Sequence, residues 1–324
     1  MQLLPKNIAS KILENFTEYQ YLFTEIQSKF LSDLYSRFES IENGNLVLYY
    51  AKQTHQDILR QKDYNLNFNI SYEKFWENHH KAHPKQISIQ KIAKDTFLPK
   101  ETARRKILQL LKKKILNKKN TNIGWLPNEQ YKNNYNLLID GEINDVCKLI
   151  FFICEKQNIS ISKEELRKEI KEQFSFYWFH YLGAQLEYLK IWNKKFNDPE
   201  LFLILIQVAN LIMTGLKKKN LFYKDFFNDP SLLKEFISLS ISATSISEAT
   251  RIPRATCVRK LKHLVKMRMI SKDKISKRYY MIPDFASEDL GIQKLSEKVI
   301  KIFSEFFFIC LREINAKNLS LLKK

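Results

Sequence analysis

The sequence predicts a mainly α-helical protein built from two similar halves. Glycine occurs 6 times and proline 8 times in 324 residues, which favours long helices over turn-rich sheets. A segment near residue 90 also recurs near residue 245 at a constant offset of 154 residues. Each half is therefore expected to hold a helix, a tight turn, a second helix and a short β-hairpin, with further helices on both sides.

The recurring segment covers residues 88–110 and 242–264, and it contains eight pairs of identical residues. The pairs are Ser88/Ser242, Ile92/Ile246, Thr96/Thr250, Pro99/Pro253, Thr102/Thr256, Arg105/Arg259, Lys106/Lys260 and Leu110/Leu264. We interpret this match as an internal duplication.

Each copy has the pattern of a short helix, a tight turn and a second helix. Ser88 and Ser242 are suitable N-caps, because a serine oxygen satisfies backbone donors at a helix start. Pro99 and Pro253 end the first helix, since the residue before a proline is disfavoured in the helical region, and proline suits the start of a new helix. Apolar residues at helical spacing then predict one buried face on the second helix. They are Ala103, Ile107, Leu110 and Leu111 in the first copy and Cys257, Leu261, Leu264 and Val265 in the second.

A polar, basic segment with a strand-like end follows each second helix. Residues 117–122 lead into 123–127, and residues 271–278 lead into 279–283. The closing prolines are 156 residues apart, so the second hairpin should be two residues longer than the first.

Together, the two helices and the hairpin resemble the winged helix-turn-helix of bacterial transcription regulators. That resemblance implies that the second helix enters the major groove of DNA and that the hairpin, or wing, touches the DNA backbone. A winged helix that binds protein and only carries a solvated basic face remains an alternative.

The positive charge of the chain is concentrated in the same two copies. Residues 99–120 carry nine Lys/Arg and one acid, and residues 251–278 carry eleven and one, so the two stretches hold +18 of the formal +19. Two such basic segments on an otherwise nearly neutral protein favour a nucleic-acid partner. We therefore predict double-stranded DNA as the ligand.

The predicted DNA contacts come from the second helices and the wings. Base reading is assigned to Lys100, Arg104 and Arg105 in the first copy and to Arg254, Arg259 and Lys260 in the second, with Lys262 on the same basic face. Phosphate contacts are assigned to Thr102 and Thr256 on the helices and to Lys118, Lys119, Lys277 and Arg278 on the wings.

The duplication extends over the whole chain and divides it into repeats 1–162 and 163–324. Their winged helices span about 75–130 and 230–285, each with helices before it and one trailing helix. The flanking helices resemble those of MarR-type regulators, in which terminal helices from two subunits hold a pair of winged helices. The D-x-R pattern of that family is missing from these wings. The resemblance implies a single-chain pseudo-dimer that regulates transcription.

Several alternatives stay open at this point. A plasmid or phage replication initiator with two winged helices, or a nucleoid architectural protein, would share the charge pattern. An apolar face at Phe303, Phe306 and Phe307 could support a homodimer, although core burial is the more common fate of such rings. The aromatic run 174–188 could line an effector pocket, but such runs are more often core.

Other functions find little support in the residues. No phosphate-binding, dinucleotide-binding or hydrolase motif occurs, so we expect no enzyme and no cofactor. His79 and His83 have metal-like spacing without an evident fourth ligand, so no metal site is predicted. Residues 201–216 are apolar but short for a membrane span, and we expect a buried helix there. The four cysteines stand singly and the start lacks a signal peptide, so we expect buried free thiols in a cytoplasmic protein.

Overall fold

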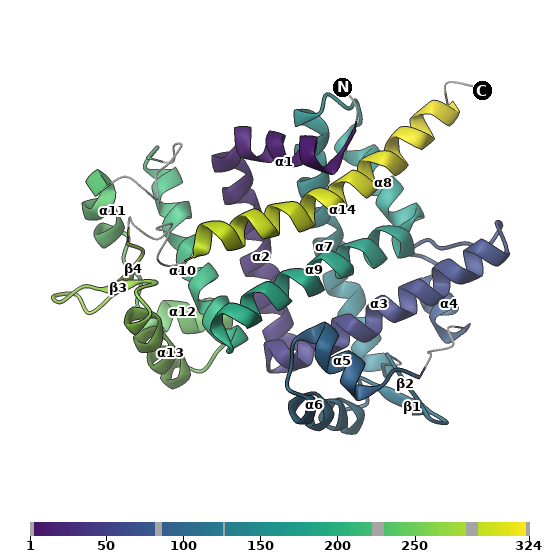
Figure 1. Ribbon diagram of the computed structural model, residues 1–324, viewed down its shortest axis with the longest axis horizontal. Coiled ribbons are helices and arrows are strands. Elements are labelled where there is room, and N and C mark those ends of the chain that lie inside the picture. The colour runs from purple at the N-terminus through teal and green to yellow at the C-terminus, as the bar shows by residue number, and fades with distance from the viewer. Residues whose placement is uncertain (1–2, 82–85, 126, 222–229, 283–290, 322–324) are drawn as a thin grey trace. The chain divides into compact units, whose positions relative to one another are not determined.

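The computed structural model describes residues 3–81, 86–125, 127–221, 230–282 and 291–321 (Figure 1). Within these residues the protein is mainly α-helical, as predicted. The described strands form two small antiparallel sheets of two strands each.

The same order of elements occurs twice along the chain. The first series is α1 (Pro5–Glu14), α2 (Phe16–Phe38), α3 (Ile41–Tyr64), α4 (Phe75–Lys81), α5 (Ile89–Thr96), α6 (Lys100–Lys112), β1 (Asn117–Lys119), β2 (Asn122–Gly124) and α7 (Glu129–Lys156). The second is α8 (Lys163–Glu172), α9 (Phe174–Phe196), α10 (Pro199–Lys218), the 3-10 turn η2 (Pro230–Leu232) with α11 (Leu233–Ser238), α12 (Ala243–Thr250), α13 (Arg254–Lys266), β3 (Ser271–Lys272), β4 (Tyr279–Tyr280) and α14 (Ile292–Leu321). Each element of the first series thus has a counterpart in the second.

The chain folds into two compact units that do not coincide with the repeats 1–162 and 163–324. Unit 1 contains residues 1–11, 42–190 and 301–324, and unit 2 contains residues 12–41 and 191–300. Helix α2 belongs to the first repeat in sequence, but its described contacts include α10 and α12 of the second repeat. Unit 2 is therefore built from both halves of the sequence.

Helix α10 is the central element of unit 2. Asp198 caps it by accepting a hydrogen bond from the backbone of Glu200, and Pro199 occupies its first turn. Helices α2, α12 and α13 pack against α10. Phe202 stacks on Trp192 with ring centroids 4.3 Å apart and an interplanar angle of 9°. Burial of this apolar helix supplies much of the hydrophobic stabilisation of unit 2.

The same helix is, among those described, the one whose length and composition would allow it to cross a membrane. In this fold 61% of its most apolar window is buried inside the protein. Leu201 to Val208 is a continuous buried run. This burial fits the expectation of a buried helix at residues 201–216.

Unit 1 is held by a cluster of aromatic rings from several helices. Phe75 of α4 stacks on His55 of α3 at 4.9 Å and contacts Phe174 of α9 at 5.4 Å. Trp125, which follows β2, and Tyr135 of α7 lie 6.1 and 6.4 Å from the same ring. Burial lowers the pKa of His55 to about 3, so its imidazole is neutral in the folded protein.

The last helix contributes its aromatic side to the core of unit 1. Phe303, Phe306 and Phe307 are at most 3% exposed, which confirms core burial for these rings. Tyr181 of α9 lies 5.9 Å from Phe306, and Tyr188 lies 6.0 Å from Phe303. All four cysteines are buried free thiols, as expected. They are Cys147, Cys154, Cys257 and Cys310.

Candidate nucleic-acid interface

The two basic stretches fold into similar substructures, which we name module 1 (residues 88–124) and module 2 (residues 242–280). In each module the first helix begins at the predicted serine cap. The Ser88 side chain accepts a hydrogen bond from Lys91 N at 3.2 Å, and the Ser242 side chain accepts one from Ser245 N at 3.0 Å. The capping prediction is confirmed in both modules.

A tight turn separates the two helices of each module. Phe97 and Arg251 end the first helix in the left-handed conformation, with φ of 54° and 64°. Non-glycine residues adopt this conformation rarely, so its occurrence at equivalent positions marks a shared turn geometry. The next residues, Leu98 and Ile252, point inward and are 8% and 0% exposed. The burial of these two side chains fixes the direction in which the second helix starts.

The second helices, α6 and α13, bury the apolar stripe that the spacing predicts. Most of its members are at most 2% exposed, while Leu111 and Val265 are half-buried. The fully buried ones are Ala103, Ile107 and Leu110 in α6 and Cys257, Leu261 and Leu264 in α13. The opposite side of each helix therefore faces solvent.

Most predicted DNA contacts lie on that solvent side or on the hairpins. Ten basic residues are exposed: Lys100, Arg104, Arg105, Lys118, Lys119, Arg254, Arg259, Lys262, Lys277 and Arg278. Thr102 and Thr256 are half-buried in the first turn of α6 and α13. A hydroxyl at this position, beside unpaired backbone N–H groups, suits a phosphate oxygen.

Lys260 requires a correction, because it is buried in an ion pair and does not project from the basic face. Its side chain is 8% exposed, and its Nζ lies 2.5 Å from Asp198 Oδ2 and 3.0 Å from Glu200 Oε2. Two of the three N–H donors of this ammonium have carboxylate partners, and burial against the start of α10 keeps the group away from the surface that a base would approach. Lys260 therefore anchors α13 to the start of α10, and we remove it from the DNA-contacting set.

Module 1 contains the equivalent ion pair. Lys106 Nζ lies 2.6 Å from Glu42 Oε2 at the start of α3, and the lysine side chain is 11% exposed. Glu42 and Glu200 are themselves equivalent positions of the two repeats, 158 residues apart. This role could have been predicted from the duplication, because the lysine recurs at the offset of 154 residues and the glutamate recurs at the offset of 158 residues.

Two of the exposed arginines are already engaged by neighbours. Arg104 Nε donates to Glu101 Oε2 at 3.0 Å, and Arg254 Nε donates to Thr244 Oγ1 at 3.0 Å. The Glu101 carboxylate places a negative charge on the face where module 1 would meet phosphate. Module 2 carries Ala255 at the equivalent position, so its face lacks that charge.

Wing 1 is the hairpin of β1 and β2. Its register pairs Asn117 with Gly124 and Lys119 with Asn122. At its base, Trp125 is 2% exposed and its carbonyl oxygen lies 2.5 Å from Nε2 of His79. The wing is thereby fastened to α4 and to the aromatic cluster of unit 1.

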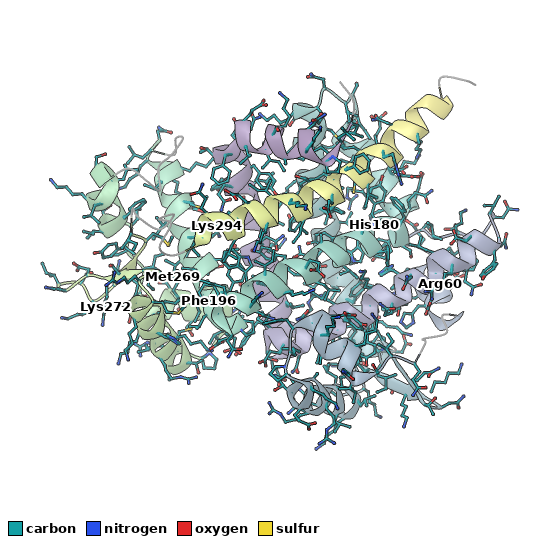
Figure 2. The ribbon with its side chains drawn as sticks, in the orientation of Figure 1. Arg60, His180, Phe196, Met269, Lys272 and Lys294 are labelled. Atoms are coloured by element: carbon teal, nitrogen blue, oxygen red, sulfur yellow. The ribbon has the colours of Figure 1, made fainter. Side chains whose placement is uncertain are left out.

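Wing 2 is the hairpin of β3 and β4, which pairs Ser271 with Tyr280 and Lys272 with Tyr279. Tyr279 also exchanges backbone hydrogen bonds with Ile241 at 2.8 and 2.9 Å, which ties the wing to the segment before α12. Ser271 to Tyr280 spans ten residues, against eight from Asn117 to Gly124, so the second hairpin is two residues longer, as predicted. Figure 2 labels Lys272 on β3 and Met269 just before it.

One exposed apolar residue on this wing is absent from the predicted DNA contacts. Ile275, between Lys274 and Ser276, is 92% exposed, the highest value among the large hydrophobic residues described. The sequence feature that could have indicated it is a single isoleucine inside a lysine-rich hairpin.

No group of three metal-ligating side chains occurs among the residues that the structure describes. His79 instead contacts the backbone of Trp125. The side chains of His80 and His83 lie outside the described part of the chain.

Comparisons with protein-family models, with curated proteins and with solved structures find no match to this chain.

Proposed function

We propose that this chain is a sequence-specific double-stranded DNA-binding protein that carries two winged helix-turn-helix modules and regulates transcription. The observation that carries the proposal is that the basic residues of the second helix are arranged in the same way in both modules. One lysine of the second helix is buried against an acid of the scaffold, while the remaining basic residues of that helix face solvent. A second helix whose basic side chains are only hydrated by solvent has no need of a buried ion pair that fixes its position.

The proposed mechanism places α6 and α13 in the major groove. The groove is about 12 Å wide and admits one α-helix, with the side chains of its exposed face directed at base edges. Arg105 and Arg259 are exposed at equivalent positions and can each form a bidentate pair with guanine. Arg104 and Arg254 reach the same region once they exchange their present partners for DNA.

Phosphate contacts would come from the helix starts and the wings. Thr102 and Thr256 lie in the first turns of α6 and α13, where the helix dipole also favours an anion. Lys118 and Lys119 extend from wing 1, and Lys277 and Arg278 from wing 2. These contacts set register and release counterions but carry no sequence information themselves.

The buried ion pairs support this mechanism by positioning the reading helices. Lys106 joins α6 to α3, and Lys260 joins α13 to α10. A helix held on a rigid scaffold loses less conformational freedom on binding, and its arginines keep their spacing. The two lysines thus act as positioning residues.

Fluorescence anisotropy with labelled duplexes over a range of salt concentrations tests DNA binding. We expect log affinity to fall linearly with log salt, by about 0.9 per neutralised phosphate. Replacing both Lys118 and Lys119 by alanine should reduce that slope by about two. Lys168→Ala and Lys298→Ala, exposed lysines outside the modules, are matched controls and should leave the slope unchanged. Affinity that does not respond to salt contradicts the proposal.

Selection from a random duplex library tests sequence specificity. A regulator with two reading modules should enrich a two-part motif, and each part should be lost when the corresponding module is mutated. Enrichment of no motif would instead assign the protein to the architectural class, whose binding depends on backbone contacts and DNA deformability.

A further inference from the structure

The tip of wing 2 presents an apolar side chain at the centre of a basic loop. Ile275 is 92% exposed, and Lys272, Lys274, Lys277 and Arg278 are the exposed basic residues of the same hairpin. In Figure 1 the loop between β3 and β4 projects away from the helices of module 2. Single exposed apolar residues are common on protein surfaces, so the position of Ile275, and not its exposure alone, requires an explanation.

The loop that carries Ile275 is held in one conformation by its own hydrogen bonds. Asp273 N donates to Arg278 O at 2.8 Å, and Lys277 N donates to Asp273 O at 3.1 Å. Arg278 N donates to Ser276 Oγ at 3.3 Å, and Lys277 adopts the left-handed conformation with φ of 58°. These bonds close the loop on both sides of Ile275. The isoleucine is therefore displayed by a structured turn.

The one acid of the hairpin is turned into the loop. Asp273 Oδ2 accepts a hydrogen bond from Ser276 N at 2.5 Å. Hydrogen bonds from the side chain and backbone of Ser276 lower the pKa of Asp273, so the carboxylate is stabilised as an anion within the turn. Asp273 Oδ2 thus faces the loop and Asp273 is half-buried, whereas the exposed charged residues around Ile275 are the cations Lys272, Lys274, Lys277 and Arg278.

Wing 1 has no counterpart of this arrangement. Its two strands are joined through Asn120 and Thr121, which are exposed and polar. The two extra residues of wing 2 therefore coincide with the addition of an apolar tip. This difference between the wings adds to the differences between the second helices, where Glu101 corresponds to Ala255.

We propose that Ile275 inserts into the DNA minor groove as a wedge between two base pairs and bends the duplex at the module 2 half-site. This inference rests on the proposed DNA-binding function. Apolar side chains that enter the minor groove unstack a base step and kink the duplex toward the major groove. The surrounding lysines and arginine would hold the two phosphate backbones on either side of the wedge, where their charges are complementary to DNA.

An inserted side chain of this kind distinguishes DNA sequences by the energy that each base step needs to unstack. Pyrimidine–purine steps such as TA unstack with the least energy, whereas A-tracts are stiff. We therefore expect a preference for a TA step under wing 2 and none under wing 1. The preference should exist without any hydrogen bond from the wing to a base edge.

The test compares wild type with Ile275→Ser on a short duplex that carries the selected site and a fluorophore at each end. Resonance energy transfer at saturating protein reports the bend, and a 2-aminopurine at the step facing wing 2 reports unstacking. Leu137→Ser is the matched control, since Leu137 is 82% exposed on α7 and lies in no module. Lys274→Ala serves as a second variant that removes a charge from the tip and keeps the wedge.

We expect wild type and Leu137→Ser to bend the duplex and to raise the 2-aminopurine signal. Ile275→Ser should lose both effects and the preference for TA, while its affinity falls by less than about tenfold, because the cost of unstacking disappears with the wedge. Lys274→Ala should keep the bend and lower the salt slope. An unchanged bend in Ile275→Ser, with salt-dependent binding intact, overturns the wedge but leaves the proposed function standing. Absence of salt-dependent binding in wild type overturns both.

Discussion

The ammonium of Lys260 lies 3.0 Å from the carboxylate of Glu200, and the equivalent Lys106 lies 2.6 Å from Glu42. Both pairs join the second helix of a module to the start of the long helix on which that module is built. Lys262, two residues further along α13, is exposed. Lys260 therefore holds α13 in place, whereas Lys262 is available to a ligand. Substituting each lysine in turn distinguishes the two roles.

Lys260→Met should destabilise unit 2 without changing the salt dependence of DNA binding. Removing the lysine leaves Asp198 and Glu200 close together without their counter-charge. Both carboxylates retain some solvent, so we expect a loss of about 2 kcal/mol, below the roughly 3 to 5 kcal/mol of a fully buried pair. Urea denaturation measures this loss. Lys262→Met is the control, and it should lower the salt slope while the urea midpoint stays in place.

Local patterns in the sequence predicted the modules well, because the features that define them act over a few residues. The caps at Ser88 and Ser242 and the buried stripes of α6 and α13 depend on spacing within one helix. The role of Lys260 could not be found in this way. Its partners precede it by about 60 residues, and the nearest cations in sequence, Arg259 and Lys262, are exposed.

Long-range packing was likewise beyond the reach of local patterns. The repeats were defined by sequence offsets, which say nothing about which helix packs on which. Helix α2 has its apolar residues at helical spacing and could satisfy them against any long apolar helix. In the structure it packs against α10, which lies in the other repeat. Contacts between helices of different repeats therefore determine which residues belong to each compact unit.

Arg105→Ala and Arg259→Ala should each weaken the selected site far more than random DNA. A bidentate arginine–guanine pair discriminates by about 1 to 3 kcal/mol, which corresponds to roughly 5- to 150-fold in affinity. Competition anisotropy with specific and random duplexes measures both losses. Equal losses on the two duplexes would show that these arginines contact phosphate only.

Glu101→Gln should increase the affinity of module 1 for DNA at low salt. The substitution releases Arg104 from its 3.0 Å ion pair and removes a negative charge from the exposed face of α6. The pair is well exposed, so the stability of unit 1 should not change measurably. The reverse change in module 2, Ala255→Glu, should weaken binding. Identical affinities of wild type and both variants would place this face away from the DNA.

The stability of unit 1 should fall as the pH drops below about 6.5, since His55 is buried in its neutral form. Burial lowers the pKa of His55 to about 3, while the unfolded chain binds the proton near pH 6.5. Between these values the unfolded state holds one more proton, which costs about 1.4 kcal/mol of stability per pH unit. Burial, together with the positive charges of Lys52 and Arg312, lowers the pKa of His180 to about 4, so His180 adds to the effect.

Urea denaturation at a series of pH values measures this dependence. His55→Phe keeps a ring against Phe75 and should flatten the slope by one proton, and His180→Phe should flatten it over a narrower range. A slope that survives in the double variant would assign the effect to other groups.

The two half-sites of the preferred DNA should differ in sequence, because the two reading faces differ. Arg104 of module 1 corresponds to Val258 of module 2, and Glu101 corresponds to Ala255. If the chain acts as a pseudo-dimer, it should protect an imperfect inverted repeat whose halves lie one helical turn apart, on the order of 34 Å. Arg104→Val should then make the module 1 half resemble the module 2 half. Footprinting combined with library selection and a mass measurement of the complex tests this. Protection of one half-site that persists unchanged when the other module is mutated would show that the modules bind independently.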